Sequence, residues 1–193
     1  ELVTNHNTSE KEIFVQDAAR NIYLINGTGR VLWKQPLDGI IMGEVHQVDM
    51  YKNGKLQYLF NTREKVHLID RNGNYVDRYP VSLRAPATNG LSLFDYDNNK
   101  NYRIFLAAEN RKIYVYDIEG NIVTGWRFNT TESEVKGEIQ HFRIEDKDYI
   151  VFSDRNRTYL LDRRGRERIR VREPLHLSPH NPLTLDMNIR EEK

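Results

Sequence analysis

The chain has 193 residues, a hydrophobic fraction of 38% and a formal net charge of +1. This length can bury a core and suggests one or two domains, while the balanced charge creates no overall field that would attract nucleic acid or an anionic membrane. The sequence has no cysteine, which excludes disulfides, thiolate metal sites and cysteine nucleophiles without fixing the compartment. No apolar run approaches the roughly 18 residues of a membrane helix, so we expect no membrane span.

Four turns of similar sequence recur along the chain. Their glycines lie 44, 47 and 45 residues apart, at Gly29, Gly73, Gly120 and Gly165. A short Asn or Asp side chain, which can accept hydrogen bonds from turn N–H groups, stands three residues before each glycine, at Asn26, Asp70, Asp117 and Asp162. A constant period of this size indicates a repeat architecture, and it explains these residues by turn chemistry alone.

Each turn is framed by segments with the alternating pattern of β-strands. The strands expected before the turns are residues 22–25, 66–69, 113–116 and 158–161. More exposed strands are expected after the turns, at residues 31–33, 75–79, 122–126 and 168–172. Two further strands precede each unit, at 2–5 and 12–15, 44–50 and 56–60, 91–94 and 103–107, and 138–144 and 149–152. Four antiparallel strands in about 45 residues are typical of a propeller blade, so the sequence predicts an all-β propeller with four four-stranded blades.

We expect one domain over residues 1–193, with blades at about 1–36, 42–80, 88–128 and 136–172. Residues 174–188 repeat the pattern of residues 80–95, so residues 173–193 are expected to start a fifth blade or to close the ring, with 183–187 as the innermost strand. Four blades and one strand suggest a piece of a larger propeller, a half-ring completed by self-association, or a closed four-bladed ring. The chain starts at Glu1 without Met, which leaves a removed leader or a longer parent protein open.

Two of the turns continue to a tryptophan, as Asn26-Gly-Thr-Gly-Arg-Val-Leu-Trp33 and from Asp117 to Trp126. Here the sequence resembles the PQQ-like (quinoprotein-like) and WD40-like propeller repeats, although Tyr79 takes the tryptophan position in the second blade. The adjacent cysteine pair of the quinone-dependent dehydrogenases is absent, and no residues match their calcium site. The resemblance therefore implies the non-enzymatic branch of scaffold and sensor propellers, often exported by bacteria. It implies no cofactor and a periplasmic, cell-surface or secreted location, with the cytoplasm left open.

One loop has oxygen-bearing side chains at alternate positions, which is the pattern that calcium prefers. They are Asp95, Asp97, Asn99 and Asn101. Arg103 stands where a carboxylate would be expected, and Lys100 where glycine would ease the turn. The sequence therefore favours an ordinary polar hairpin over a calcium site.

Polar residues also begin the innermost strands, which line the channel of a closed propeller. They are Glu44, His46, Glu138, Gln140 and His141. A wet channel accounts for such residues without any ligand, so they are a weak candidate for a channel site.

The densest basic run holds six arginines between Arg163 and Arg172. Arginine can bind phosphate, but charged residues on an outer strand also prevent edge-to-edge aggregation. No stacking aromatics accompany the run, so we do not expect nucleic acid as a partner.

The leading functional hypothesis is a non-catalytic propeller that presents loops to a protein partner. The loops are the connections between the second and third strands, with Arg20, Arg63, Arg111 and Arg155 as candidate contacts. The alternative is a carbohydrate-binding or carbohydrate-active propeller with its site at the channel, where Trp33 and Trp126 could stack on sugars. A third interpretation is a structural spacer. No local catalytic signature occurs, so enzymatic activity is left open but is not expected.

Overall fold

The computed structural model describes residues 1–172, 175 and 183–184, which form four antiparallel sheets in chain order. Blade 1 contains β1 (Leu2–Thr4), β2 (Lys11–Gln16), β3 (Asn21–Ile25) and β4 (Val31–Pro36), and blade 2 contains β5 (Met42–Val48), β6 (Gln57–Asn61), β7 (Lys65–Ile69) and β8 (Val81–Ser82). Blade 3 contains β9 (Ser92–Phe94), β10 (Arg103–Ala107) and β11 (Ile113–Asp117), and blade 4 contains β12 (Gln140–Ile144), β13 (Lys147–Ser153), β14 (Thr158–Leu161) and β15 (Glu167–Arg170).

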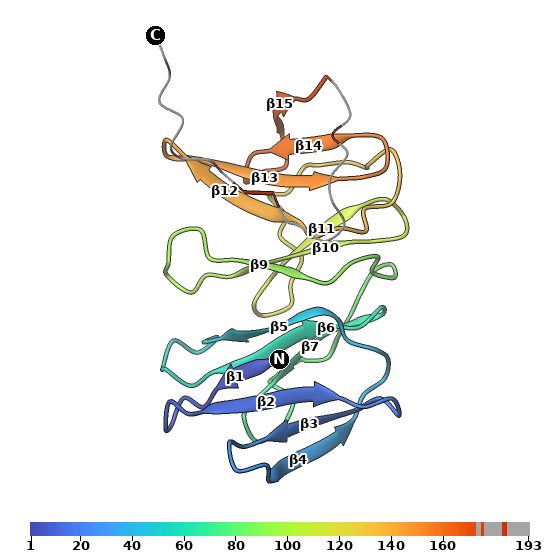
Figure 1. Ribbon diagram of the computed structural model, residues 1–193. Coiled ribbons are helices and arrows are strands. Elements are labelled where there is room, and N and C mark those ends of the chain that lie inside the picture. The colour runs from blue at the N-terminus through green and yellow to red at the C-terminus, as the bar shows by residue number, and fades with distance from the viewer. Residues whose placement is uncertain (173–174, 176–182, 185–193) are drawn as a thin grey trace.

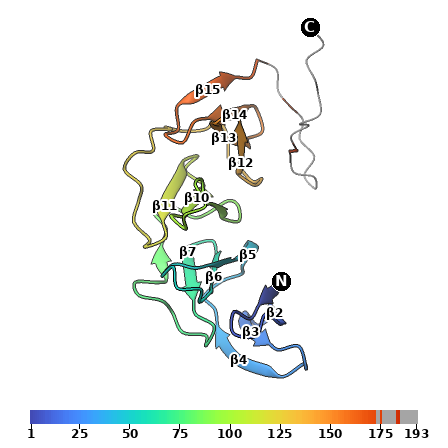
Figure 2. The same cartoon turned by 90° about the vertical axis from the view of Figure 1, so that its left-hand side faces the viewer.

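The sheets stack face to face as an open arc (Figures 1 and 2). The first strands β5 and β12 lie on the concave side, together with the start of the chain (Figure 2). The described residues contain no helix, and hence none that could cross a membrane. The prediction of an all-β propeller is confirmed. The expected strand at 183–187 lies largely outside the described residues, of which only Leu183 and Thr184 belong to it.

The repeated turns have the predicted chemistry. The four glycines have φ between +76° and +87°, a region that is cheap for glycine. The Asx side chain accepts backbone N–H bonds from two and four residues further on, as Asp70 does from Asn72 and Asn74 and Asp162 does from Arg164 and Arg166. The recurring Asx residues therefore hold turns.

The outer strands expected at 75–79 and 122–126 are wrong in their bounds. Tyr75 and Ile122 each make one bridge to the neighbouring strand. The chain then turns, through Asp77 at φ +42° in blade 2. Blade 2 resumes its outer edge as the short β8, whereas the third sheet has only three strands. Tyr79 leaves the sheet edge because its hydroxyl donates to Ile118 O of blade 3, 2.8 Å away.

Three apolar cores lie between successive blades. The core between blades 1 and 2 includes Phe14, Leu24 and Phe60, and the core between blades 3 and 4 includes Phe105 and Phe152. A third core joins blades 2 and 3. Amide side chains also clamp neighbouring segments together, as Gln47 does by binding both the N–H and the C=O of Thr4. Each blade is therefore stabilised mainly by its neighbours, as expected of a repeat protein.

Candidate functional site

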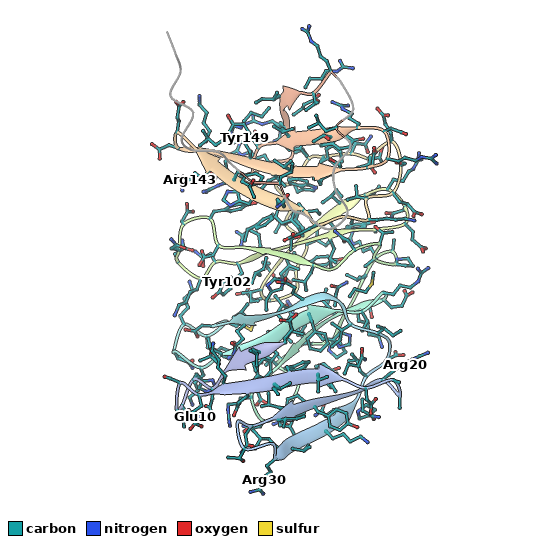
Figure 3. The ribbon with its side chains drawn as sticks, viewed as in Figure 1. Glu10, Arg20, Arg30, Tyr102, Arg143 and Tyr149 are labelled. Carbon is teal, nitrogen blue, oxygen red and sulfur yellow. The ribbon has the colours of Figure 1, made fainter. Side chains whose placement is uncertain are left out.

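The two edges of the arc carry different loops. The connections between second and third strands lie on one edge, where Arg20 projects (Figure 3). The hairpins between first and second strands lie on the opposite edge, marked by Glu10 and Tyr102 (Figure 3). Antiparallel strands of alternating direction produce this segregation, so each edge presents one kind of loop from every blade.

The four candidate partner arginines each belong to one of these second-to-third-strand loops, and each is exposed. Backbone bonds from the inter-blade linkers hold their loops: Arg20 O accepts from Leu37 N at 2.8 Å, and Arg63 O accepts from Ala87 N at 2.7 Å. Arg111 O accepts from Thr131 N at 2.9 Å. In the fourth loop, Arg155 N donates to Ser133 Oγ at 3.0 Å.

An ion pair between Arg63 and Glu109 also joins the loops of blades 2 and 3. Both side chains are at least a third exposed, so the pair contributes little to stability. The pair instead fixes where these two charged side chains lie relative to each other on the surface.

The candidate channel residues are distributed along the concave side, and several are engaged in structural contacts. Gln140 binds Leu183 through both amide atoms, at 3.0 and 3.2 Å. His46 Nε2 lies 3.3 Å from Leu91 O. Glu44 and Glu138 are exposed. No hydrogen bond or ion pair within the described ranges joins the members on β5 to those on or beside β12.

The loop considered for calcium uses its oxygens within the protein. Asp95 accepts backbone N–H bonds from Asn99 and Lys100, and Asn101 Oδ1 accepts from Lys52 Nζ at 2.8 Å. Asp97 pairs with Arg163 at 2.9 Å. In the part of the chain that the structure describes, no group of three or more His, Asp or Glu is placed to hold a metal ion.

A charged cluster that sequence reasoning missed lies between blades 3 and 4. His141 Nε2 lies 2.7 Å from Asp148 Oδ1, and Arg163 Nε lies 2.5 Å from Asp148 Oδ2. Burial alone would raise the pKa of Asp148, but pairing with His141 and Arg163 outweighs it and lowers the pKa below its ordinary value. Arg163 also lies over the Tyr96 ring at 4.3 Å. No local signal identifies this set, because its members come from different strands.

Beside this cluster is a pocket of about 290 Å³, whose walls include Tyr96, Asp97, Arg103, Arg163 and Arg164. The Tyr96 hydroxyl is buried without a hydrogen-bond partner among the described residues, and burial raises its pKa. The other arginines of the basic run lie on or beside the exposed β15. Arg168 donates to Asp148 O and lies over Tyr149, so part of the run packs on its own sheet.

This arrangement of sheets and loops defines a β-propeller protein. BBS1N, in its complex with ARL6DN, matches with 14% identity and a TM-score of 0.56 over 86% of this chain and 43% of its own. BamB from Moraxella catarrhalis matches with 19% identity and a TM-score of 0.55 over 88% of this chain and 47% of its own. Both neighbours are β-propellers, and at these identities the likeness shows the fold alone.

The chain therefore spans less than half the length of these neighbours. No protein-family model and no curated protein matches the sequence.

Proposed function

We propose that this chain is a non-catalytic propeller module that binds a protein partner through its second-to-third-strand loops. The observation that carries the proposal is the shared anchoring of these loops. Arg20, Arg63 and Arg111 each accept a linker N–H through the backbone carbonyl while the side chain remains exposed. A surface held in place before binding loses less conformational entropy on association, which favours affinity.

The chemistry of this edge suits a partner with an acidic patch. Arg20, Arg111 and Arg155 have no carboxylate partner within the described part of the chain, whereas Arg63 pairs with Glu109. Guanidinium groups bind carboxylates through two parallel hydrogen bonds. The exported bacterial setting implied by the sequence resemblance belongs to this same proposal, and one of the two fold neighbours is a bacterial protein.

The carbohydrate alternative has less support. Trp33, expected to stack on sugar, donates its Nε1–H to Arg71 O at 2.8 Å and packs against Phe14. Trp126 packs edge-on against Phe105 of its own blade and against the core that blades 3 and 4 share. Both indoles are thus engaged in packing between blades.

The proposal is tested by capture of partner proteins from an extract of the source cells, quantified by mass spectrometry. Arg20→Ala/Arg111→Ala should lower capture of the specific partner at least about tenfold, as expected when interface arginines are removed. Arg30→Ala/Lys55→Ala removes two exposed charges from turns of the other edge and should leave capture unchanged. Equal loss in both variants, or no specific capture by the wild type, would refute the loop proposal.

A further inference from the structure

The repeat allows the junctions between blades to be compared position by position. In every blade the residue before the turn Asx pairs with one residue of the second strand, and this pair fixes which positions are equivalent. In blades 1 and 3 the pairs are Ile25 with Ile13 and Tyr116 with Ile104. Glu12 of blade 1 and Arg103 of blade 3 each come directly before this pair, so they occupy the same position of the second strand. The two blades therefore carry opposite charges at one equivalent position.

The residue across each of these junctions is an arginine. Arg71 of blade 2 and Arg163 of blade 4 each follow the Asx of their turn directly. At the blade 1–2 junction, Glu12 supplies the carboxylate that pairs with Arg71. At the blade 3–4 junction the position of Glu12 is taken by Arg103, so the equivalent positions hold two arginines instead of an ion pair.

The blade 3–4 junction also holds a pocket of about 290 Å³, which Arg103 and Arg163 both line. This volume is at the lower end of the range for sites that bind small molecules. The charged residues of its walls are Arg103, Arg163, Arg164 and Asp97. The walls come from the hairpin that Tyr102 marks in Figure 3 and from the last turn of blade 4. The pocket is therefore on the hairpin edge, opposite the second-to-third-strand loops.

One of the three arginines already has carboxylate partners. Arg163 pairs with Asp97 at 2.9 Å and with the buried Asp148 at 2.5 Å, and it lies over the Tyr96 ring at 4.3 Å. These contacts hold Arg163 in place as a wall of the pocket. They also engage Asp97, the one carboxylate that lines the pocket within the described residues.

The other two arginines form no ion pair in the part of the chain that the structure describes. Arg103 donates through Nη1 to two backbone carbonyl oxygens of its own hairpin, at 2.9 and 3.4 Å. Asp117 lies opposite Arg103 in the sheet, but its carboxylate accepts the N–H of Asn121 and so holds the turn. Arg164 is exposed. Guanidinium groups in this state can bind an external carboxylate through two parallel hydrogen bonds.

We propose that this pocket binds a small hydroxylated organic acid through Arg103 and Arg164. The carboxylate of the acid then supplies the negative charge that Glu12 supplies at the blade 1–2 junction. Asn99 and Asn101 use their Oδ1 atoms within the protein, which leaves their amide N–H groups as donors to hydroxyl oxygens. The site is separate from the arginine loops, so the proposal does not rest on the loop proposal.

Titration of isotope-labelled protein with glucuronate, gluconate and tartrate, followed by amide NMR shifts, tests the proposal. We expect saturable shifts around Arg103 and Arg164 with at least one of these acids. Glucose, which keeps the hydroxyl groups but has no carboxylate, should produce none. Added salt should weaken the binding, because salt screens charges that solvent reaches. No saturable shift with any of the three acids, or equal shifts with glucose, would refute the proposal.

Substitutions in the walls test the assigned residues. Arg103→Gln should raise the dissociation constant at least about tenfold, as expected when a hydrogen bond to a charged group is lost. Arg164→Gln, on an exposed side chain, should have the same effect and provides a second variant should Arg103→Gln fail to fold. Arg30→Gln makes the same change at an exposed turn residue of blade 1 and should leave binding unchanged. Binding that survives both wall substitutions would contradict the assignment.

Arg103→Glu tests the comparison between the junctions directly. It places the protein's own carboxylate at the position of Glu12, so binding of the acid should be lost while the fold is kept. Binding of the acid by folded Arg103→Glu at the wild-type affinity would overturn the proposal.

Two further probes distinguish the source of the anion. Inorganic phosphate that binds more tightly than all three acids would identify a phosphate site instead. A short peptide of aspartates that binds more tightly than all three acids would identify a contact for acidic side chains of a partner. In either case the assignment to a small organic acid would be wrong.

Discussion

Two junctions between blades place their charges differently. Between blades 1 and 2, Glu12 is only 2% exposed and pairs with Arg71 beside a core of Phe14 and Tyr58. Between blades 3 and 4, the buried Asp148 connects through Arg163 to the exposed Asp97.

The histidines follow the same division. His67, at the first of these junctions, is buried against Phe60, while His141, at the second, has a carboxylate partner. The comparison teaches that the same packing scheme accommodates two arrangements of charge. At the blade 1–2 junction, here called sealed, the carboxylate is buried and only Arg71 keeps some exposure, whereas at the blade 3–4 junction the charged side chains extend to solvent beside a pocket. Of the charged side chains at these two junctions, those between blades 3 and 4 are the ones that a ligand or a partner can reach.

The largest expected effect comes from a substitution in the apolar core between blades 1 and 2. Phe14→Ala removes a ring that contacts Trp33, Tyr58 and Phe60, and it should lower the free energy of unfolding by about 3–5 kcal/mol. Phe152→Ala is the matched change at the blade 3–4 junction and should fall in the same range. Urea unfolding followed by circular dichroism measures both. A loss below about 1 kcal/mol for Phe14→Ala would contradict the close packing of this junction.

His67 should make stability depend on pH. Burial lowers the pKa of His67 from 6.5 to about 4, and Thr62 Oγ1 and Tyr75 OH lie 3.2 and 2.9 Å from its ring nitrogens. Between these two pKa values the unfolded chain binds more protons, so stability is complete above pH 6.5 and falls as the pH drops toward 4. The loss attributable to His67 should reach about 2–3 kcal/mol.

The control for this prediction is His67→Gln, which keeps a polar side chain but does not titrate. Unfolding midpoints measured at several pH values should vary less in this variant than in the wild type between pH 6.5 and 4. The same slope in both proteins would show that another group is responsible.

The sealed ion pair should be costly to break from one side. Glu12→Gln leaves the Arg71 charge without its carboxylate and should lower the free energy of unfolding by about 2 kcal/mol, which is less than the about 3–5 kcal/mol of a fully buried pair because Arg71 keeps some exposure. Arg71→Met combined with Glu12→Gln removes both charges and should recover part of the loss. A double-mutant cycle measures the coupling between the two side chains. Additive losses would show that the two charges are independent.

The turns could be predicted from the sequence because their chemistry is local. Asp70, Gly73 and their equivalents satisfy backbone groups within five residues. The bounds of the outer strands of blades 2 and 3 could not be predicted from the sequence, because contacts with the following blade determine them. Tyr79 belongs by pattern to a strand, but its hydroxyl binds Ile118 O of the next blade.

The candidate site divides in the same way. The position of the second-to-third-strand loops on one edge can be predicted from the sequence, because loop position in a propeller follows from strand order. The pairing of Asp148 with Arg163, and that of Glu12 with Arg71, depends on the register and stacking of separate strands. Side chains brought together from distant positions leave no periodic mark in the sequence, so these clusters could not be predicted.

The smallest expected effect separates the two junctions most directly. Asp148→Asn removes the carboxylate between His141 and Arg163, but Asp97 still pairs with Arg163, so the loss should be about 1 kcal/mol. Screening by salt acts on charges that solvent reaches and acts little on buried pairs. In unfolding measured at low and high salt, salt should therefore reduce the effect of Asp148→Asn, whose partner Arg163 is 32% exposed and also pairs with the exposed Asp97, more than that of Glu12→Gln, whose partner Arg71 is 22% exposed. Equal salt sensitivity in both variants would mean that the two junctions expose their charges equally, and the distinction between a sealed and a reachable junction would be wrong.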